Sequence, residues 1–294
     1  MNIIVTIPAY NEEFTIGKVI QDIKKIMSAN RYSYKILVVD DGSTDKTVEI
    51  ARKAGAIVYS HPKNYGLAET FKTEVEQCLK LNADIIVHTD ADGQYLAEDI
   101  PKLIKDVEKG NDLVLGSRFL GKIEEMPWLK RFGNRFFSRI ISGVARLKIN
   151  DAQTGFRAFT RKVAEKLPIT SNFTYTQEQI IRAVRAKFRI KEVPVYFAKR
   201  RNGQSRLVKS PFDYALRSTI SILRIYRDYE PLKFFWSVGG TFFLLGLGVG
   251  SWLLYLFVRY GSIGHVPLTI LSALLMLIGV QIMLFGFLAD ILRR

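Results

Sequence analysis

The sequence reads IIVTIPAYNEE at residues 3–13, where an apolar run of strand length passes directly into a polar segment. Further short apolar runs lie at residues 36–39, 57–59, 85–87 and 113–115. Between them, apolar residues recur at helical spacing, at residues 16–27, 48–54, 67–79 and 100–107. Alternating strands and helices of this kind predict an α/β domain in which helices cover both faces of a mostly parallel sheet.

Two long uncharged runs lie near the end of the chain, at residues 234–258 and 266–289. Each is longer than the roughly 20 residues that an α-helix needs to cross a bilayer core of about 30 Å. The sequence therefore predicts a two-helix transmembrane hairpin. The first run also contains glycines that could allow close helix packing, within one hairpin or between subunits of a homo-oligomer. They are Gly239, Gly240, Gly246, Gly248 and Gly250.

The number of Lys and Arg residues differs between the connecting segment and the outer flanks of these two runs. The segment between the runs has only Arg259, whereas Lys and Arg stand on both outer flanks. The outer residues are Arg224, Arg227, Lys233, Arg293 and Arg294. Because cytoplasmic flanks are enriched in Lys and Arg, this pattern predicts that both termini and the α/β domain are cytoplasmic. We expect a multi-pass protein of the cell membrane or of the endoplasmic reticulum membrane.

Residues 127–233 are strongly basic, with 24 Lys and Arg against 7 Asp and Glu. Residues 1–126 instead carry 16 Lys and Arg against 20 Asp and Glu. A basic block of this kind can face anionic lipid headgroups, a phosphorylated substrate or nucleic acid, or it can be a solvated surface. No helix-turn-helix, zinc-binding or RNA-binding motif accompanies the charge. We therefore expect a lipid bilayer or a phosphate group as partner, and no nucleic acid.

Polar clusters follow three of the predicted strands: PAYNEE at 8–13, DDGSTD at 40–45 and DADGQ at 90–94. The carboxyl ends of parallel strands meet at one edge of a sheet, so we expect the clusters to line one crevice. Carboxylates crowded there repel one another unless a cation neutralises them. Asp90 and Asp92 can both reach a hard divalent ion, and Gln94 offers a further oxygen. For the second cluster, the alternative is a turn that caps the next helix.

In this order and spacing, the three clusters resemble those of family 2 glycosyltransferases of the GT-A fold. The resemblance implies a nucleotide-sugar donor and the residues that bind it: Pro8, Tyr10, Glu12, Asp40, Asp41, Asp90 and Ala91. Asp92 would be the principal ligand of Mg2+ or Mn2+, with Asp90 and Gln94 beside it. A metal is needed because a negatively charged diphosphate cannot otherwise bind in an acidic site.

Four further segments are similar to the polyprenyl-phosphate glycosyltransferases, a subgroup that includes dolichyl-phosphate mannose synthases. They are GSR at 116–118, DAQTGFR at 151–157, EVPV at 192–195 and RRNGQSRL at 200–207. In this subgroup the sugar goes to a lipid phosphate, which planar guanidinium groups bind well. The resemblance nominates five residues for that phosphate: Arg118, Arg131, Arg201, Ser205 and Arg206. For any one of them, a surface ion pair is the alternative.

Glu178 lies in the helix where related transferases carry an acidic residue, and it could orient the donor sugar. It would then be catalytic together with Asp92 and Arg118. The alternative is a helix-start residue on an exposed turn. Residues 179–183, QIIRA, match half of the QxxRW motif of processive sugar polymerases, but Ala stands in place of Trp. This difference favours a single transfer.

We expect the catalytic domain to span residues 1–210, with a donor half at 1–117 and an acceptor half at 118–210. Residues 127–147 interleave aromatic and basic side chains, which predicts an amphipathic helix in the lipid headgroup region. The alternative is an ordinary helix that packs its aromatic face on the sheet. A second interfacial helix is expected at 211–230, before the first membrane span.

These features predict an inverting, metal-dependent enzyme that transfers one hexose to polyprenyl or dolichyl phosphate at the cytoplasmic face of the membrane. The donor would be GDP-mannose, UDP-glucose or UDP-N-acetylglucosamine, and the product a lipid-linked sugar for glycosylation. A phosphate acceptor is already an oxyanion and needs no separate general base. Two alternatives stay open. One is a transferase that acts on a lipid or polysaccharide hydroxyl, and the other is a non-catalytic membrane protein that binds nucleotide sugars or anionic lipid.

Overall fold

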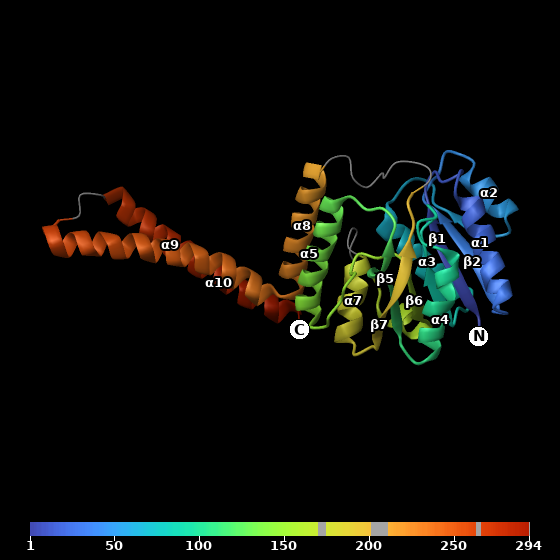
Figure 1. Ribbon diagram of the computed structural model, residues 1–294. Coiled ribbons are helices and arrows are strands. Elements are labelled where there is room, and N and C mark those ends of the chain that lie inside the picture. Colours follow the sequence, from blue (N-terminus) through green and yellow to red (C-terminus); the bar gives the residue numbers. More distant parts are fainter. Residues whose placement is uncertain (170–174, 201–210, 263–265, 294) are drawn as a thin grey trace. The chain divides into compact units, whose positions relative to one another are not determined.

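The computed structural model describes residues 1–169, 175–200, 211–262 and 266–293 (Figure 1). The chain divides into two compact units, Met1–Ala215 and Leu216–Arg294. The first unit contains the β-sheet, and the second contains the long C-terminal helices.

A seven-stranded sheet with the strand order β3-β2-β1-β4-β6-β5-β7 forms the centre of the first unit. Its strands are β1 Ile3–Ala9, β2 Tyr34–Asp40, β3 Ile57–Ser60, β4 Ile85–His88, β5 Leu113–Ile123, β6 Arg157–Thr160 and β7 Ile190–Phe197. Neighbouring strands are parallel, except that β6 runs antiparallel to both β4 and β5. The predicted α/β class with a mostly parallel sheet is confirmed. The sequence pattern does not indicate β6, because its four residues are too few for a periodicity and begin with a charged arginine.

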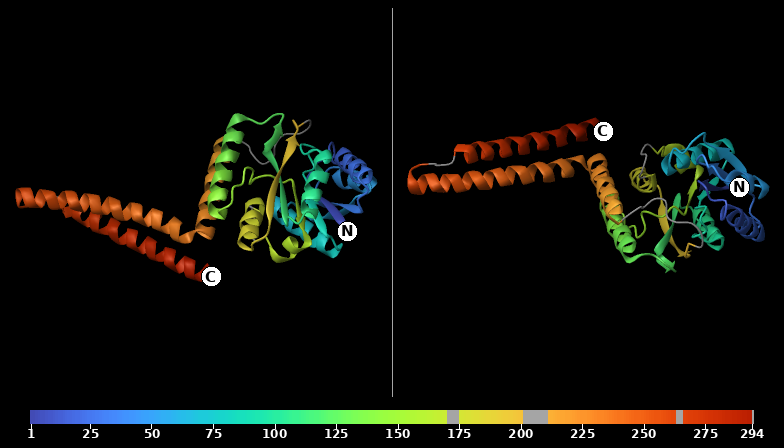
Figure 2. Two further views of the ribbon diagram at one scale, coloured as in Figure 1. Left: turned by 60° about the horizontal axis from the view of Figure 1, so that its bottom comes forward. Right: turned by 90° about the horizontal axis from the view of Figure 1, so that it is seen from above.

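Helices cover both faces of the sheet (Figures 1 and 2). In the first unit they are α1 Ile16–Ala29, α2 Thr47–Lys53, α3 Leu67–Lys80, η1 Ala97–Asp99, α4 Ile100–Glu108, α5 Trp128–Ala145, α6 Arg161–Lys166 and α7 Tyr175–Arg185. On β1, Val5 and Ile7 belong to one hydrophobic core with the apolar sides of α1 and α4. The intervening Thr6 lies on the other face, where its hydroxyl donates to Glu74 of α3. This alternation is the two-residue period of a strand that is buried on both faces.

A wide bulge interrupts β5 where it pairs with β7. Ser117 pairs with Pro194, but the next pair is Lys122 with Tyr196, so β5 has extra residues between the two positions. A Cβ atom at Gly121 would overlap the Val195 carbonyl, which explains why glycine is needed there. Bulges of this kind change the direction of side chains next to active sites. This bulge begins with Arg118.

Helix α5 has two different sides. Phe137 and Ile141 are buried in the first unit, whereas Trp128 is 78% exposed and Phe132 is 65% exposed. The buried side anchors the helix to its own domain, and the other side leaves large aromatic side chains exposed. The position of this helix in the lipid headgroup region stays a prediction.

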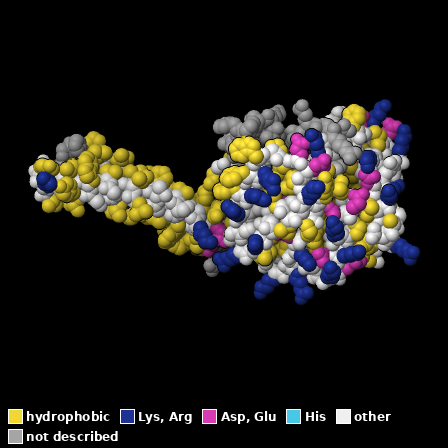
Figure 3. Space-filling view, in the orientation of Figure 1, with side chains coloured by type: hydrophobic (Ala, Val, Ile, Leu, Met, Phe, Trp, Pro, Cys, Tyr) yellow, Lys and Arg dark blue, Asp and Glu magenta, His cyan; other side chains and the backbone are white. Residues whose placement is uncertain are grey.

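The second unit ends in a hairpin of α9 Pro231–Tyr260 and α10 Val266–Arg293, preceded by α8 Pro211–Tyr229, which begins in the first unit. Both α9 and α10 are long and apolar enough to cross a membrane, and hydrophobic side chains cover them (Figure 3). They approach closely at glycines: a Cβ atom at Gly239 would lie 2.5 Å from the Gly279 carbonyl oxygen. Ser272 donates its hydroxyl to the Gly246 carbonyl (2.7 Å). The predicted pair of apolar C-terminal helices is confirmed.

Candidate active site

The three polar clusters meet at one edge of the sheet, as the sequence predicts. They follow β1, β2 and β4, which are parallel neighbours in the order β2-β1-β4. The antiparallel β6 begins at the same edge, because Arg157 at its start pairs with His88 at the end of β4. Residues 151–156, which lead into β6, therefore join the three clusters. We call this strand-end edge the candidate active site.

The loops that follow β1 and β2 are tied to each other. The Asn11 amide donates to the Ser43 hydroxyl (2.8 Å), and the Thr44 amide donates to the Asn11 side-chain oxygen (2.8 Å). The Glu12 amide donates to the Thr47 hydroxyl (2.7 Å). The second half of DDGSTD thus has a structural role in joining the two loops, whereas the N-cap of α2 is Lys46 and makes no side-chain cap hydrogen bond. These bonds hold the predicted donor residues Pro8, Tyr10 and Glu12 in place; Pro8 is buried and the other two are partly exposed.

Asp40 and Asp41 are both buried, but they make different contacts. Asp41 accepts hydrogen bonds from the backbone amides of Tyr65 (2.9 Å) and Gly66 (2.8 Å), one on each carboxylate oxygen. The ring of His61 also bonds to it (2.9 Å). Asp41 therefore fixes the turn between β3 and α3. Asp40 accepts from the backbone amide three residues further along the chain (3.1 Å).

Asp90 and Asp92 lie in the loop after β4, on either side of the buried Ala91. Burial and repulsion from Asp92 raise the pKa of Asp90 to about 6. Asp92 accepts from the Gln94 amide (3.0 Å), and the Gln94 side chain donates to the Ala198 carbonyl (3.1 Å). Gln94 thus connects the acidic loop to the end of β7.

These carboxylates fit a divalent cation that is shared with a ligand. Among the described residues, no three His, Cys, Asp or Glu side chains come close enough to hold a metal on their own. Mg2+ is commonly bound by one or two carboxylates together with substrate phosphates and water. Burial and, after it, repulsion from Asp92 raise the pKa of Asp90, and such an ion would relieve the repulsion. The carboxylates therefore fit Mg2+ or Mn2+, with Asp90 and Asp92 as the residues that would hold the ion.

Arg200 compensates part of this negative charge. Its guanidinium lies 3.3 Å from Glu12 and 3.5 Å from Asp92. Sequence reasoning included Arg200 only as part of a motif and assigned it no role at the site. The contact joins the ends of β1, β4 and β7, which are far apart in sequence, so no local pattern could reveal it.

Arg118 is held rigidly in the candidate active site by Asp151. Its Nε and one terminal nitrogen donate to the two oxygens of that carboxylate, at 2.7 and 2.8 Å. The Arg118 amide also donates to Asp151 (3.0 Å). Both side chains are buried. Because a bidentate pair of this kind fixes the plane of the guanidinium, Arg118 is held in one orientation at this edge of the sheet. Its role toward a phosphate stays a prediction.

Lys130 is a further cation at the site, and sequence reasoning missed it. Burial lowers its pKa, as does repulsion from Arg118 and Arg200, while Asp92 opposes this shift. Lys130 therefore lies among the charged groups of the site. The side chain of Arg131, the predicted ligand on the same helix, is exposed. The helical spacing could have indicated Lys130. Residues 130, 134, 137 and 141 share one side of an α-helix, and the last three are buried.

Residues 151–157, DAQTGFR, connect the parts of the site. Besides the Asp151 contact, the Thr154 hydroxyl donates to the Gly116 carbonyl (2.7 Å). Arg157 is fully buried and donates to the Gln179 side chain of α7 (2.9 Å). Sequence reasoning used this segment only for its resemblance to a family. Its structural role depends on contacts with β5, β4 and α7 that the sequence does not contain.

Glu178 is buried at the start of α7, with 3% of its surface exposed. It pairs with Arg182 (2.8 Å) one turn further on. The alternative interpretation of an exposed helix-start residue therefore does not hold. Three predicted acceptor residues, Arg201, Ser205 and Arg206, lie outside the described residues.

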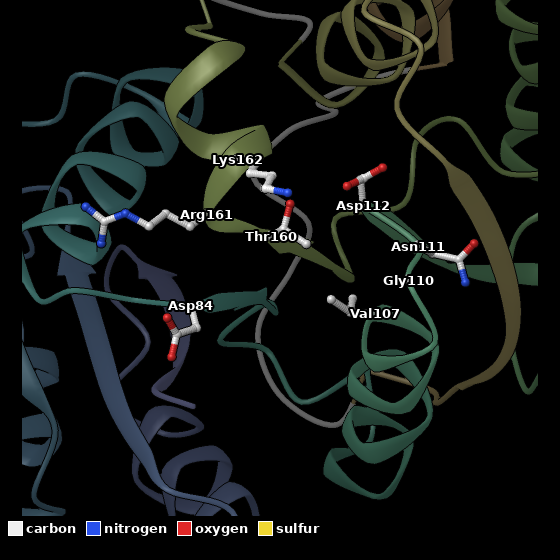
Figure 4. A pocket seen from close by; sticks show the side chains of 8 residues that line it. All are labelled: Asp84, Val107, Gly110, Asn111, Asp112, Thr160, Arg161 and Lys162. Atoms are coloured by element: carbon white, nitrogen blue, oxygen red, sulfur yellow. The ribbon is translucent and has the colours of Figure 1, made fainter.

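A pocket of about 350 Å3 lies at the opposite edge of the sheet (Figure 4). Asp84 precedes β4, Asp112 precedes β5 and Thr160 ends the antiparallel β6, so the pocket is formed at the amino ends of the parallel strands. Its acidic groups already have partners: Asp84 accepts from the Asn2 amide (2.6 Å) and Asp112 from the Arg189 amide (2.9 Å). This pocket is therefore separate from the candidate active site.

An α/β sheet with paired carboxylates at its strand ends, faced by cations, has the arrangement of enzymes that use nucleotide-sugar donors. The chain belongs to glycosyltransferase family 2: the family model described as Glycosyl transferase family 2 matches residues 4–168. A second model, described as GtrB C-terminal hairpin, matches residues 230–294.

Named relatives agree with this assignment. Glycosyltransferase AglJ of Haloferax volcanii is 32% identical over 97% of this chain and 91% of its own length. The dolichyl-phosphate hexose transferase of the same organism is 35% identical over 69% of this chain and 85% of its own. Dolichol-phosphate mannosyltransferase of Pyrococcus furiosus is 30% identical over 93% of this chain and 78% of its own. The chain is thus a glycosyltransferase, and its resemblance to the polyprenyl-phosphate subgroup of the family is confirmed.

Solved structures share the fold of the first unit. Glucosyl-3-phosphoglycerate synthase from Mycobacterium tuberculosis, crystallised with Mn2+, UDP and glucosyl-3-phosphoglycerate, has a TM-score of 0.58 and 22% sequence identity. The match covers 75% of this chain and 79% of that one. At this identity the likeness supports the fold alone.

Proposed function

We propose that this enzyme transfers one hexose, with inversion, from a nucleotide diphosphate sugar to polyprenyl or dolichyl phosphate. The observation that carries the proposal is the meeting of two kinds of charge at one sheet edge. Asp90 and Asp92 provide the acidic part, and Arg118, Lys130 and Arg200 provide the basic part. A site for two phosphorylated substrates needs both. Relatives named for transfer to dolichyl phosphate support the same acceptor.

The donor occupies the side of the site formed by β1, β2 and β4. Its base and ribose contact Pro8, Tyr10, Glu12 and Asp40, while Asp41 shapes the pocket wall through residues 65–66. The diphosphate lies at Asp90, Ala91 and Asp92, with Gln94 beside them. A Mg2+ or Mn2+ ion bound to these carboxylates would neutralise the diphosphate and favour its departure. The donor is GDP-mannose, UDP-glucose or UDP-N-acetylglucosamine.

The acceptor phosphate occupies the side formed by β5 and α5. Arg118 holds it, together with Lys130 and Arg131 of α5 and the predicted residues Arg201, Ser205 and Arg206. A phosphate oxygen then attacks the anomeric carbon, forming a new C–O bond as the bond to the diphosphate breaks on the opposite side. Because this oxygen is already anionic, no group has to remove a proton. Glu178 orients the sugar from the start of α7.

The hairpin and α5 place this reaction at the membrane. The exposed Trp128 and Phe132 of α5 enter the headgroup region, and α9 and α10 span the bilayer. Both termini and the catalytic domain are cytoplasmic, because Lys and Arg flank the outer ends of the hairpin. Glycines on the outer side of α9, such as Gly240 and Gly248, leave room for a second copy of the hairpin.

Removal of the metal site tests the donor half of this proposal. We expect Asp92→Ala to abolish transfer to polyprenyl phosphate without unfolding the protein, because Asp92 is partly exposed and repels Asp90. EDTA should have the same effect on the wild-type enzyme. As a control, Asp22→Ala removes an exposed carboxylate from α1 and should leave transfer unchanged. Near-normal turnover by Asp92→Ala at saturating Mg2+ or Mn2+ would contradict the metal assignment.

A further inference from the structure

A buried polar cluster lies directly behind the candidate active site. Glu74 of α3, His88 at the end of β4 and Thr6 of β1 are all fully buried. One Glu74 oxygen accepts from the Thr6 hydroxyl (2.9 Å). The other lies 3.1 Å from His88 Nε2, within ion-pair distance, but the two atoms are not aligned for a hydrogen bond. The proposed function assigns no role to any of the three side chains.

Such a cluster is costly to place in a protein core. Taking a carboxylate and an imidazole out of water costs several kcal/mol, which their mutual contact only partly offsets. The buried neighbours of Glu74 on the same side of α3 are Thr70, Phe71 and Cys78. The Thr70 hydroxyl is satisfied within the helix by the Gly66 carbonyl, and the other two are apolar, so an apolar side chain would also fit at position 74. A polar pair at this position therefore calls for a role other than stability.

The second nitrogen of His88 identifies that role. His88 Nδ1 lies 2.9 Å from the Gly155 carbonyl oxygen. Because a carbonyl can only accept, Nδ1 carries a proton and donates it, and Nε2 faces Glu74. The rings of Phe71 and Tyr175 contact the imidazole at centroid distances of 5.2 and 6.0 Å and hold its orientation. The position of the Gly155 backbone is thus set by the imidazole.

Gly155 in turn touches a predicted metal ligand. A Cβ atom at position 155 would lie 3.0 Å from one carboxylate oxygen of Asp90 and 3.5 Å from the other. The backbone of Gly155 therefore forms the wall against which this carboxylate packs. If the Gly155 backbone moved by a fraction of an ångström, the Asp90 carboxylate would take a different position. Metal sites depend on such outer contacts.

We propose that Glu74 and His88 are a positioning pair that holds Gly155 against Asp90 and so sets the affinity of the site for its divalent metal. The inference rests on the metal role of Asp90 in the proposed function. Glu74 orients the imidazole, the imidazole holds the Gly155 carbonyl, and Gly155 fixes the carboxylate. Neither Glu74 nor His88 touches the substrate or the metal.

Two isosteric variants of His88 separate positioning from stability. In His88→Asn the amide nitrogen replaces Nδ1 and can still donate to Gly155, but the second Glu74 oxygen loses its contact, while the first keeps the Thr6 hydroxyl. In His88→Gln the amide replaces Nε2 and can still reach Glu74, but the Gly155 carbonyl loses its donor. Each variant leaves one buried polar group without a partner, so both should lower the melting temperature by similar amounts. Only His88→Gln removes the hydrogen bond that holds the Gly155 backbone against Asp90.

The direct measurement is Mn2+ binding to the full-length protein in detergent, with GDP or UDP and without acceptor, followed by the electron paramagnetic resonance signal of free Mn2+. We expect His88→Gln to bind Mn2+ about 10-fold more weakly than wild type, and His88→Asn to stay within about 3-fold of it. Gly155→Ala, whose Cβ would press on Asp90, should weaken binding even though the pair is intact. Met27→Ala serves as control, because it removes a fully buried side chain from α1, away from the pair, and should leave Mn2+ affinity unchanged while lowering the melting temperature.

Three outcomes decide between the possibilities. Weaker Mn2+ binding in His88→Gln and Gly155→Ala, but not in His88→Asn or Met27→Ala, supports the positioning pair. Equal Mn2+ affinities for His88→Gln and His88→Asn, with both melting temperatures lowered, would mean that the pair only stabilises the fold. A wild-type protein that binds no Mn2+ with either nucleotide would overturn the proposed function itself, and the inference with it.

Discussion

Asp90 connects the electrostatics of the site to a measurable pH dependence. Its pKa is raised from 3.8 to about 6, chiefly by burial and by Asp92. For a carboxylate with a raised pKa, the stability gained by protonation is fully present below about pH 4 and is lost as the pH rises through about 6. Metal-free protein therefore carries a destabilising carboxylate at neutral pH.

We expect Asp90→Asn to raise the melting temperature of the metal-free protein at pH 7, because the amide carries no charge to repel Asp92. The gain over wild type should shrink as the pH falls from 7 to 5, where wild-type Asp90 becomes protonated. With saturating Mn2+ the order should reverse, since only the wild type has both ligands. Melting curves of both proteins over this pH range test the idea, and a difference that does not change with pH would contradict it.

Lys130 offers a second test at the residue scale. If it faces a substrate phosphate, Lys130→Ala removes a charge-assisted contact worth about 1.5–3 kcal/mol, or about 10- to 100-fold in kcat/KM. Arg139→Ala, which removes an exposed cation from the same helix, should change kcat/KM less than about 2-fold. Steady-state kinetics with varied polyprenyl phosphate gives both values. Equal effects of the two substitutions would mean that α5 acts through its overall charge.

At the scale of elements, the sequence predicts the strand-end clusters because each follows an apolar run that can be recognised locally. It does not predict the contacts of Arg200, Lys130 or Gly155. These depend on how β7, α5 and the segment before β6 come together, which only the tertiary structure contains. For Asp41, the sequence predicts the position at the site but not the hydrogen bonds from the backbone amides of residues 65–66.

The hairpin allows an element-scale prediction with a matched control. A Cβ atom at Gly246 would lie 2.8 Å from the Ser272 carbonyl oxygen, whereas one at Gly248 meets no atom within 4 Å. Gly246→Leu should therefore separate α9 from α10, at a cost of about 1–3 kcal/mol. Gly248→Leu should leave the contact between α9 and α10 intact, and it would disturb only the proposed contact with a second copy. Thermal unfolding in detergent compares them, and a loss confined to Gly248→Leu would show that subunit contacts use these glycines instead.

At the scale of the whole molecule, the acidic and basic segments of the chain coincide with the proposed donor and acceptor segments. The acidic first 126 residues contain the proposed donor and metal groups, and the basic residues 127–233 contain most of the proposed acceptor groups. Composition alone predicts this division and the apolar hairpin, because both depend on counts over long segments. It does not predict which cations face the acidic loop, because Arg131 and Lys130 are adjacent in the sequence and differ only in the side of α5 that they occupy.

The central claim is that a lipid phosphate, rather than a hydroxyl, accepts the sugar. The most direct test incubates the purified full-length protein, Mn2+ and each of the three labelled donors with polyprenyl phosphate, or with the matching polyprenol that lacks the phosphate. We predict that one donor labels polyprenyl phosphate and that none labels polyprenol, since only the phosphate presents an oxyanion to the cations of the site. Labelling of polyprenol at a comparable rate, or labelling of neither lipid with any donor, would contradict the account.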